Sequence, residues 1–340
     1  MPASKRLEQK ISRIQDGSAT ARDFIIADAK DADMAFGVTT PGRDRAGVRW
    51  KSLAEYRDQI RDVIHQDIVD IMLLSASNLE QLAVNEGLFK HSAITPAARA
   101  NDTTDIWAVR GGGYSTHPSR PFRSASIDHI KYGRLGEDCS LPATGADLGL
   151  YSITFTNNID WDYRSLEDFK AFRHEAEQKR FRYFLEVFNP NIDPGIPCDK
   201  IPSFLNDHIV RTLAGVTRAG RPLFLKIPYN GPGPLEELVS YDPGMIVGIL
   251  GGGAGTTLDA FQLIHDAQKH GARVALFGRK INLSEHPPSF IRFLRHITDG
   301  DISPTEAVRA YHDSLEKLVI KPLRPLADDL LSTTVPLSYR

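Results

Sequence analysis

The 340-residue sequence has little cysteine, no long apolar run and almost no net charge. Its two cysteines, Cys139 and Cys198, are too few for a disulfide framework or a four-thiolate zinc site. The longest apolar runs, such as 68–74, fall far short of the roughly 20 residues that span a membrane. The first twenty residues carry charges throughout and lack the apolar core of a secretory signal. With a net charge of -2, nothing favours nucleic acid, and we expect a cytoplasmic protein that acts without membrane or nucleic acid.

Several motifs that would fix a reaction are also missing. The 11 histidines form no His-x-His or His-Glu-x-x-His pattern, and His265 and His270 are five residues apart on a predicted helix, so we expect no catalytic metal. The sequence contains neither the Gly-x-Ser-x-Gly elbow of serine hydrolases nor the Gly-Lys-Ser/Thr of a P-loop. The glycine cluster at 251–255 lacks the third glycine of the dinucleotide fingerprint. We therefore expect no cofactor.

Short apolar or β-branched runs recur along the chain, each followed by a polar or glycine-rich turn and an amphipathic stretch. This alternation is typical of βα units around a parallel sheet. Helices are predicted at Ser52–Ile64 and Leu258–His270. About eight strands are predicted, at Phe24–Asp28, Val69–Leu74, Ile106–Arg110, Leu148–Thr156, Phe184–Val187, Leu223–Ile227, Ile246–Leu250 and Val274–Phe277. Eight such units favour a closed (β/α)8 TIM barrel of the α/β class, and an open doubly wound sheet is the alternative.

Two stretches of the sequence are additional to the eight βα units of a minimal barrel. Residues 111–146 are a polar, Pro/Gly-rich insertion after the third predicted strand, where a barrel places active-site loops, and they are a candidate lid. Beyond about residue 300, Ser303 and Glu306 form a capping-box pattern with Pro304 at the first helical position. We expect a C-terminal helical extension over 300–340, after a barrel core at about 20–290, in one domain that covers 1–340.

Lys226 stands near the C-terminal end of the apolar strand PLFLK, just before a Pro/Gly-rich turn. Barrel enzymes place their active sites at that end. Residue alternation puts Phe224 and Lys226 on one face, so the lysine points into the barrel if Phe224 does. Burial favours the neutral amine, which is the form that attacks a carbonyl and yields an imine. The alternative is a lysine whose ammonium group reaches solvent from the strand end.

Glycine-rich turns after the next two strands predict an anion site. Backbone N–H groups in such turns converge on an anion, and a helix N-terminus adds a favourable potential. Barrel enzymes often bind phosphate at the loops after strands seven and eight, and an arginine can bind it in bidentate fashion. Ordinary tight turns are the alternative for each cluster taken alone. The residues that we expect at a substrate phosphate are Gly251, Gly252, Gly253, Gly278 and Arg279.

Three further side chains are candidates for proton transfer or substrate positioning. If Glu186 lies on the inner face of its strand, it is beside Lys226 and can move protons during imine formation. The alternative is that Glu186 and Lys226 form a structural ion pair. Asp28 is a candidate to orient substrate hydroxyls or to take a hydroxyl proton. Tyr229, three residues past the lysine, is a candidate proton donor or pocket residue.

Other charges near these segments are weaker candidates. Lys30 and Asp31 follow Asp28 into a loop, and we expect them in surface salt bridges because loop charges are usually solvated. Arg110, at the end of the third predicted strand, is a candidate for a second phosphate contact, with less support than Arg279.

With these segments in view, the chain resembles the class I aldolase superfamily of the DhnA-type fructose-bisphosphate aldolases, which includes deoxyribose-phosphate aldolase and the autoinducer-2 phosphate thiolase. The matching segments are LKIPY at 225–229, ILGGGAGT at 249–256 and LFGRKI at 276–281. FIIADAKDADMAFG at 24–37 also looks like the family's first strand, whose acid is Asp28, although the usual Asp-His-Gly reads Asp-Ala-Lys here. The resemblance implies that Lys226 forms the imine and that a phosphate is held by Gly252, Gly253, Gly278 and Arg279.

We therefore expect a lyase that makes or breaks a carbon–carbon bond through an imine on Lys226. The substrate expected is a small phosphorylated keto or aldehyde compound related to sugars, and the resemblance implies a homo-oligomer. Two alternatives stay open. An acyl-transferring thiolase of the same superfamily would keep the lysine, and a barrel that binds a phosphorylated metabolite without catalysis would not use it for chemistry.

Overall fold

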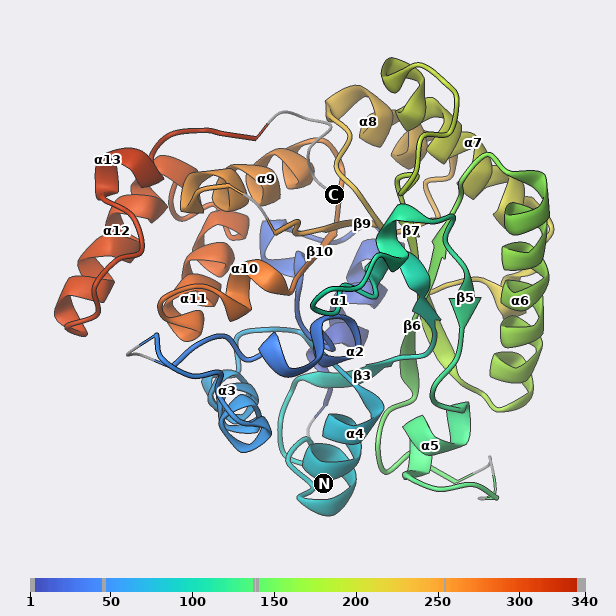
Figure 1. The fold of residues 1–340 in the computed structure, drawn as a ribbon, viewed down its shortest axis with the longest axis horizontal. Helices are drawn as coiled ribbons and strands as arrows, with labels where there is room; N and C mark the ends of the chain where they lie inside the picture. The colour runs from blue at the N-terminus through green and yellow to red at the C-terminus, as the bar shows by residue number, and fades with distance from the viewer. Residues whose placement is uncertain (1–3, 45–46, 137, 139–140, 254, 335–340) are drawn as a thin grey trace.

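The computed structural model describes residues 4–44, 47–136, 138, 141–253 and 255–334, which form a closed barrel of eight parallel strands (Figure 1). Around the barrel the order is β1-β10-β9-β8-β7-β6-β3-β2, and β2 pairs again with β1. The predicted (β/α)8 barrel is confirmed. The strands are β1 (Ile25–Lys30), β2 (Ile71–Leu74), β3 (Thr95–Arg99), β6 (Leu148–Thr154), β7 (Arg182–Phe188), β8 (Leu225–Ile227), β9 (Val247–Leu250) and β10 (Val274–Phe277).

Helices surround the barrel (Figure 1). In the parts of the chain that the structure describes, no helix is both long and apolar enough to cross a membrane. The predicted helices near residues 52 and 258 are present as α3 and α9. The long helices are α1 (Arg6–Gln15), α3 (Leu53–Gln66), α6 (Ile159–Gln178), α7 (Ile201–Ala214), α8 (Pro232–Tyr241), α9 (Thr257–Lys269), α11 (Pro287–Thr298) and α12 (Pro304–Lys317). The short ones are α2 (Asp33–Phe36), α4 (Ala76–Leu79), α5 (Ile127–Tyr132), α10 (Arg279–Asn282) and α13 (Leu326–Asp329).

Alternate residues of the strands point to opposite sides and separate two apolar cores. The inner core fills the barrel and contains Phe184 and Phe224, whose rings stack with centroids 4.6 Å apart. The outer core lies between the strands and the helices and includes Leu225 and Ile227. Because Phe224 points inward, the alternation along β8 also directs Lys226 into the barrel.

The third strand differs from the sequence prediction. The predicted range Ile106–Arg110 is wrong, because Ile106 ends the 3-10 turn Thr104–Ile106 and the residues after it form no strand. The barrel uses β3 instead, whose sequence TPAAR pairs with β2 and β6. TPAAR was not predicted as a strand because proline and alanine are depleted in strands, whereas IWAVR is rich in β-branched and aromatic residues. Burial on the barrel wall, rather than intrinsic propensity, sets the conformation of β3.

A long connection follows β3 and forms part of the barrel mouth. It runs from residue 100 to 147, so it begins earlier than the predicted insertion at 111–146. It carries α5 and a short antiparallel pair, β4 (Asp102–Thr103) and β5 (Pro121–Phe122). Trp107 stacks on Tyr114 with ring centroids 4.5 Å apart, which stiffens the first half of the connection. Residues 137, 139 and 140, and with them Cys139, lie outside the described residues.

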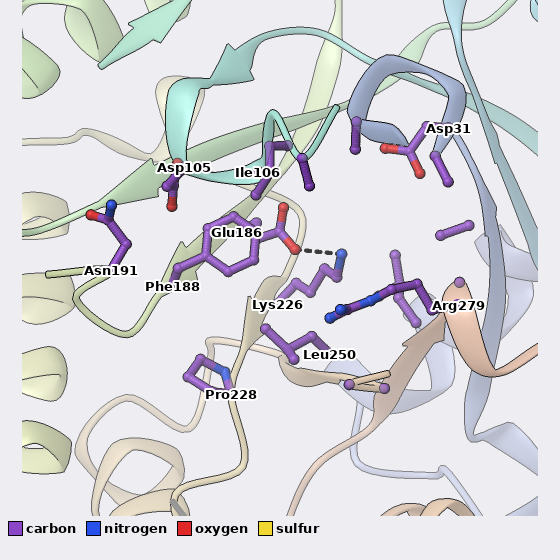
Figure 2. Close-up of a pocket in the computed structure, with 18 of the residues that line it drawn as sticks. Asp31, Asp105, Ile106, Glu186, Phe188, Asn191, Lys226, Pro228, Leu250 and Arg279 are labelled. Atoms are coloured by element: carbon purple, nitrogen blue, oxygen red, sulfur yellow. Dashed lines mark ion pairs between the residues drawn. The ribbon is translucent and has the colours of Figure 1, made fainter. Parts of the chain in front are cut away.

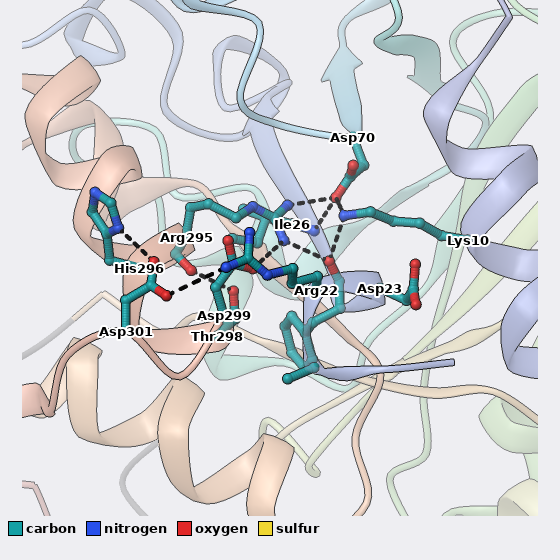
Figure 3. A network of polar contacts seen from close by, with 12 residues as sticks. Lys10, Arg22, Asp23, Ile26, Asp70, Arg295, His296, Thr298, Asp299 and Asp301 are labelled. Atoms are coloured by element: carbon teal, nitrogen blue, oxygen red, sulfur yellow. Dashed lines mark hydrogen bonds and ion pairs between the residues drawn. The ribbon is translucent and has the colours of Figure 1, made fainter. Parts of the chain in front are cut away.

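The N-terminal end of the barrel is closed by α1 and a buried charge cluster (Figure 3). Leu7 and Ile11 of α1 belong to the inner core. Asp70 is fully buried and also accepts the backbone N–H of Ile26 at 2.8 Å. At distances of 2.8 to 3.0 Å its carboxylate meets three cations, those of Arg6, Lys10 and Arg295. This closure leaves the opposite, C-terminal end of the barrel for a site.

The C-terminal extension contains the predicted helix. α12 begins at Pro304, after Ser303, whose hydroxyl accepts the N–H of Glu306 while the Glu306 carboxylate accepts the N–H of Ser303. α12 packs on α9 and α11, and the chain then passes through α13 back to the start of α9. Residues 335–340 lie outside the described residues.

Candidate active site

Lys226 lies at the C-terminal mouth of the barrel with its side chain directed inward (Figure 2). Its partner in the parallel register is Glu186 of β7, and Nζ of Lys226 forms an ion pair with Oε1 of Glu186. The two residues are 7% and 1% exposed. The alternation along the two strands thus places the two side chains together, as the sequence predicted, and a proton can pass directly between them.

Arg99 and Ser152 hold Glu186 from the other side. The Ser152 hydroxyl donates to Oε2 of Glu186 at 2.6 Å, and Nη1 of Arg99 donates to the Ser152 hydroxyl at 3.1 Å. Nη2 of Arg99 lies 3.6 Å from the same Oε2. Burial opposes the charge of Arg99, but the carboxylates of Asp31 and Glu186 outweigh it and raise its pKa. Oε2 of Glu186 is therefore fixed by the barrel, while Oε1 faces the lysine.

A cavity of about 420 Å³ adjoins this pair. This volume is within the usual range of small-molecule sites. Lys226 separates two walls of different character (Figure 2). We call one wall the arginine side, made by the loops after β9 and β10 with Gly251, Gly252, Gly278 and Arg279. We call the other the insertion side, made by the connection after β3 and the end of β7 with Asp105, Ile106, Ala108, Ser115, Phe188, Asn189, Pro190 and Asn191.

The arginine side needs its glycines for space and conformation. A Cβ on Gly251 would lie 2.3 Å from the ring of Phe277, and Gly252 has a φ of 58°, in the region that favours glycine. Gly253 does not line the cavity, contrary to the expectation of a phosphate contact. A Cβ there would lie 2.6 Å from the guanidinium of Arg279, so Gly253 makes room for this side chain.

The start of α9 does not serve the cavity in the expected way. The Thr257 N–H donates to Asp329 at 2.8 Å, and the Thr256 N–H donates to Asp259 at 2.8 Å. The chain's own carboxylates thus occupy N–H donors that were predicted to bind a substrate anion, and that part of the prediction is wrong. The loop backbone and Arg279 are the candidate anion ligands on the arginine side. Ala254, in the same loop, lies outside the described residues.

Asp28 does not reach the cavity, and its predicted position at the mouth is wrong. Ala27 and Ala29 belong to the inner core, so Asp28 and Lys30 point toward the helices. There the two side chains are fully buried, 3.0 Å apart. Burial raises the pKa of Asp28 and lowers the pKa of Lys30, although each charge favours the other. The pair is a structural element of the barrel wall.

Asp31 takes the position at the cavity that was expected for Asp28. It is 6% exposed, lines the cavity and accepts a bond from Nε of Arg99 at 2.5 Å. The prediction that Lys30 and Asp31 form surface salt bridges is therefore wrong for both residues. Lys30 is the last residue of β1 and pairs with Asp28 behind the barrel wall, and Asp31 pairs with Arg99 at the cavity, so neither charge reaches solvent.

Tyr229 and Arg110 do not belong to the residues that line the cavity. Pro228 lines the cavity next to Lys226, whereas Tyr229 is 5% exposed within the outer core, so its predicted part in the site is wrong. Arg110 is exposed in the connection after β3, and the second phosphate contact suggested for it is also wrong.

Arg99 and Ser152 were not among the residues predicted for the site. Arg99 is the last residue of β3, and its place at the C-terminal end of a barrel strand would have marked it, had TPAAR been taken as a strand. Ser152 gave no such signal, because a serine within the buried strand LGLYSIT is compatible with ordinary packing.

No family model and no curated protein sequence matches the chain. Its structure is similar to an archaeal fructose 1,6-bisphosphate aldolase, with a TM-score of 0.60 and 14% identity over 86% of this chain and 99% of the other. A second archaeal aldolase structure, in which the catalytic Lys is covalently bound to the carbinolamine intermediate of the substrate, has a TM-score of 0.60 and 15% identity over 86% and 100% of the chains. A protein from Corynebacterium glutamicum has a TM-score of 0.54 and 15% identity over 89% and 100%. These similarities establish the shared barrel fold.

Proposed function

We propose that the protein is a class I aldolase-type lyase, which forms or cleaves a carbon–carbon bond through an imine on Lys226. The observation that carries this proposal is the nearly buried pair of Lys226 and Glu186 beside the cavity. A lysine amine becomes a nucleophile when an adjacent carboxylate accepts its proton. The fold shared with Schiff-base aldolases supports the same reading.

Formation of the imine needs proton transfers that Glu186 is placed to perform. Glu186 takes a proton from the ammonium group of Lys226, and the Nζ lone pair then attacks the carbonyl carbon of the substrate. A proton moves from the nitrogen to the former carbonyl oxygen, which gives the neutral carbinolamine. Glu186 returns its proton to the carbinolamine hydroxyl, which leaves as water, and the protonated C=N bond forms.

Cleavage follows because the protonated imine accepts electrons. When the hydroxyl on the β-carbon loses its proton to a base, the electron pair of the carbon–carbon bond moves toward the imine nitrogen. An aldehyde leaves, and an enamine remains on Lys226. Protonation of the enamine carbon and attack by water release the second product and the free amine. Glu186 is the base for the β-hydroxyl, and Asp31 is placed to bind a substrate hydroxyl.

We also propose that the arginine side binds a phosphate of the substrate. Arg279 lines the cavity together with the loop backbone at Gly251, Gly252 and Gly278. A guanidinium group forms short, bidentate bonds to phosphate, and backbone N–H groups add donors of fixed position. The substrate is then a small phosphorylated ketone or aldehyde, with its carbonyl carbon at Lys226.

Reduction with borohydride tests the imine directly. The protein is incubated with dihydroxyacetone phosphate and other small phosphorylated ketones and aldehydes, reduced, digested and mapped by mass spectrometry. We expect one stable adduct on Lys226, none on the buried Lys30, and none in Lys226→Arg. Failure of the whole panel to modify Lys226, or equal modification of other lysines, would contradict the proposal.

A further inference from the structure

The insertion side of the cavity is held firmly against the barrel. The carboxylate of Asp105 accepts bonds from Thr154 of β6 at 2.7 Å and from Ser119 at 2.8 Å. Nδ2 of Asn191, which follows β7, donates at 2.9 and 2.7 Å to two backbone carbonyls of the connection, those of Ser115 and His117. This wall is therefore a preformed surface, built by bonds within the chain.

The polar side chains of this wall are largely bonded within the chain, so its apolar residues are what it offers to a ligand. Ile106, Ala108, Phe188 and Pro190 are the apolar residues of its lining (Figure 2 labels Ile106 and Phe188). Both oxygens of Asp105 accept bonds from the chain, and the amide of Asn189 exchanges two hydrogen bonds with the amide of Asn230. Contact of an alkyl or aryl group with an apolar wall removes apolar surface from water and so favours binding, whereas the wall offers few hydrogen bonds to a chain of hydroxyl groups.

The same wall is unfavourable for a phosphate. Asp105 brings a negative charge to this wall. Among the described residues that line the cavity, the cations are Arg99, Lys226 and Arg279. The first two face Asp31 and Glu186, and Arg279 belongs to the arginine side. A second phosphate at the insertion side would therefore lie near a like charge, with no cation of this wall to balance it among the described residues.

We infer that the insertion side receives an uncharged, largely apolar end of the substrate. This inference rests on the proposed function, and it implies that the aldehyde partner is an alkyl or aryl aldehyde rather than a phosphorylated sugar aldehyde. In the synthetic direction, a bond forms between the enamine carbon on Lys226 and the aldehyde carbon. The aldehyde oxygen takes a proton, and the nitrogen lone pair forms the imine, which water then hydrolyses. Phe188 and Ile106 pack on the apolar group and set the specificity.

Calorimetry with two probes tests the wall without any chemistry. Phenylbutyl phosphate carries one phosphate and an apolar end, and an alkanediol bisphosphate of matched length carries a phosphate at each end. We expect the first probe to bind at least about tenfold more tightly. Ile106→Arg should reverse or abolish this preference, whereas the matched control Ile106→Met should change it less than about twofold. Tighter binding of the bisphosphate to the wild type overturns the inference, even if the arginine variant does not fold.

A kinetic comparison tests the same point during turnover. With dihydroxyacetone phosphate as donor, kcat/KM is measured for benzaldehyde and for glyceraldehyde phosphate as acceptors. We expect a ratio of at least about ten in favour of benzaldehyde. A preference for glyceraldehyde phosphate overturns the inference and leaves the imine mechanism intact. Absence of a Lys226 adduct, with the probe preference retained, overturns the proposed function and leaves the apolar wall.

Discussion

Glu186→Gln removes the carboxylate that we assign to proton transfer and leaves a side chain of almost the same shape. Glutamine keeps an acceptor for the Ser152 hydroxyl, which now lies 2.6 Å from Oε2. It cannot take a proton from Lys226. The change therefore separates a proton-transfer role from a packing role more cleanly than a truncation to alanine.

The size of the effect follows from the position of Glu186. A positioned acid–base group contributes typically about a hundredfold to ten-thousandfold in rate. Because Glu186 is 1% exposed and touches Lys226, few other groups can replace it. We expect the rate of imine formation and kcat to fall by at least about a hundredfold. Arg99 retains Asp31 as a partner at 2.5 Å, so the protein should still fold.

The assay is the rate of borohydride-trapped adduct formation on Lys226, followed by mass spectrometry. The adduct should still form with Glu186→Gln, but slowly. Glu86→Gln is the matched control, because Glu86 pairs with Arg61 at 2.6 Å and neither residue lines the cavity. A trapping rate for Glu186→Gln within about threefold of wild type would refute the assignment and favour the structural ion pair.

Three further predictions concern phosphate binding and stability. Arg279→Met should weaken binding of a phosphorylated probe, measured by calorimetry, at least about tenfold more than binding of its unphosphorylated analogue, because hydrogen bonds to charged groups contribute about 1.5–3 kcal/mol. An equal loss of affinity for both probes would count against a phosphate role for Arg279. Asp70→Asn should lower the free energy of unfolding, measured in urea, by about 3 kcal/mol or more, because it leaves buried cations without their carboxylate. The control Asp58→Asn removes a carboxylate from an exposed ion pair and should lower the free energy of unfolding by less than about 1 kcal/mol. Burial opposes ionisation of Asp259, but hydrogen bonds from neighbouring threonines lower its pKa to about 2 from 3.8. The stabilising effect of ionised Asp259 is complete above pH 3.8 and is lost as pH falls through about 2. The difference in the free energy of unfolding between wild type and Asp259→Asn should therefore shrink over this interval. A difference that stays constant would contradict this assignment.

The sequence predicted most of the barrel because its strands carry the pattern that buried parallel strands require. Seven of the predicted strands correspond to observed ones, and each contains β-branched or large apolar residues. β3 was not predicted because its sequence Thr-Pro-Ala-Ala-Arg has little of this pattern, and its conformation depends on pairing with β2 and β6. Local pattern cannot reveal a strand that tertiary packing imposes.

The site was predictable where alternation fixed the inner face. Phe224 defined this face for β8, and Lys226 followed from it. On β1 both faces are buried, so composition could not decide whether Asp28 or its neighbours point inward. Tyr229 lies beyond the regular strand, where alternation from Lys226 places it opposite the cavity. The single domain over 1–340, the cytoplasmic location and the homo-oligomer stay predictions.

The turnover of Lys226→Arg tests the central claim most directly. Arginine keeps a cation of similar reach, but its guanidinium stays protonated at any accessible pH and cannot form the imine. If Lys226 acts as the amine nucleophile, the folded variant should turn over near the uncatalysed background, because covalent catalysis supplies several orders of magnitude in rate. A folded Lys226→Arg protein that keeps about a tenth or more of wild-type turnover would contradict the Schiff-base mechanism.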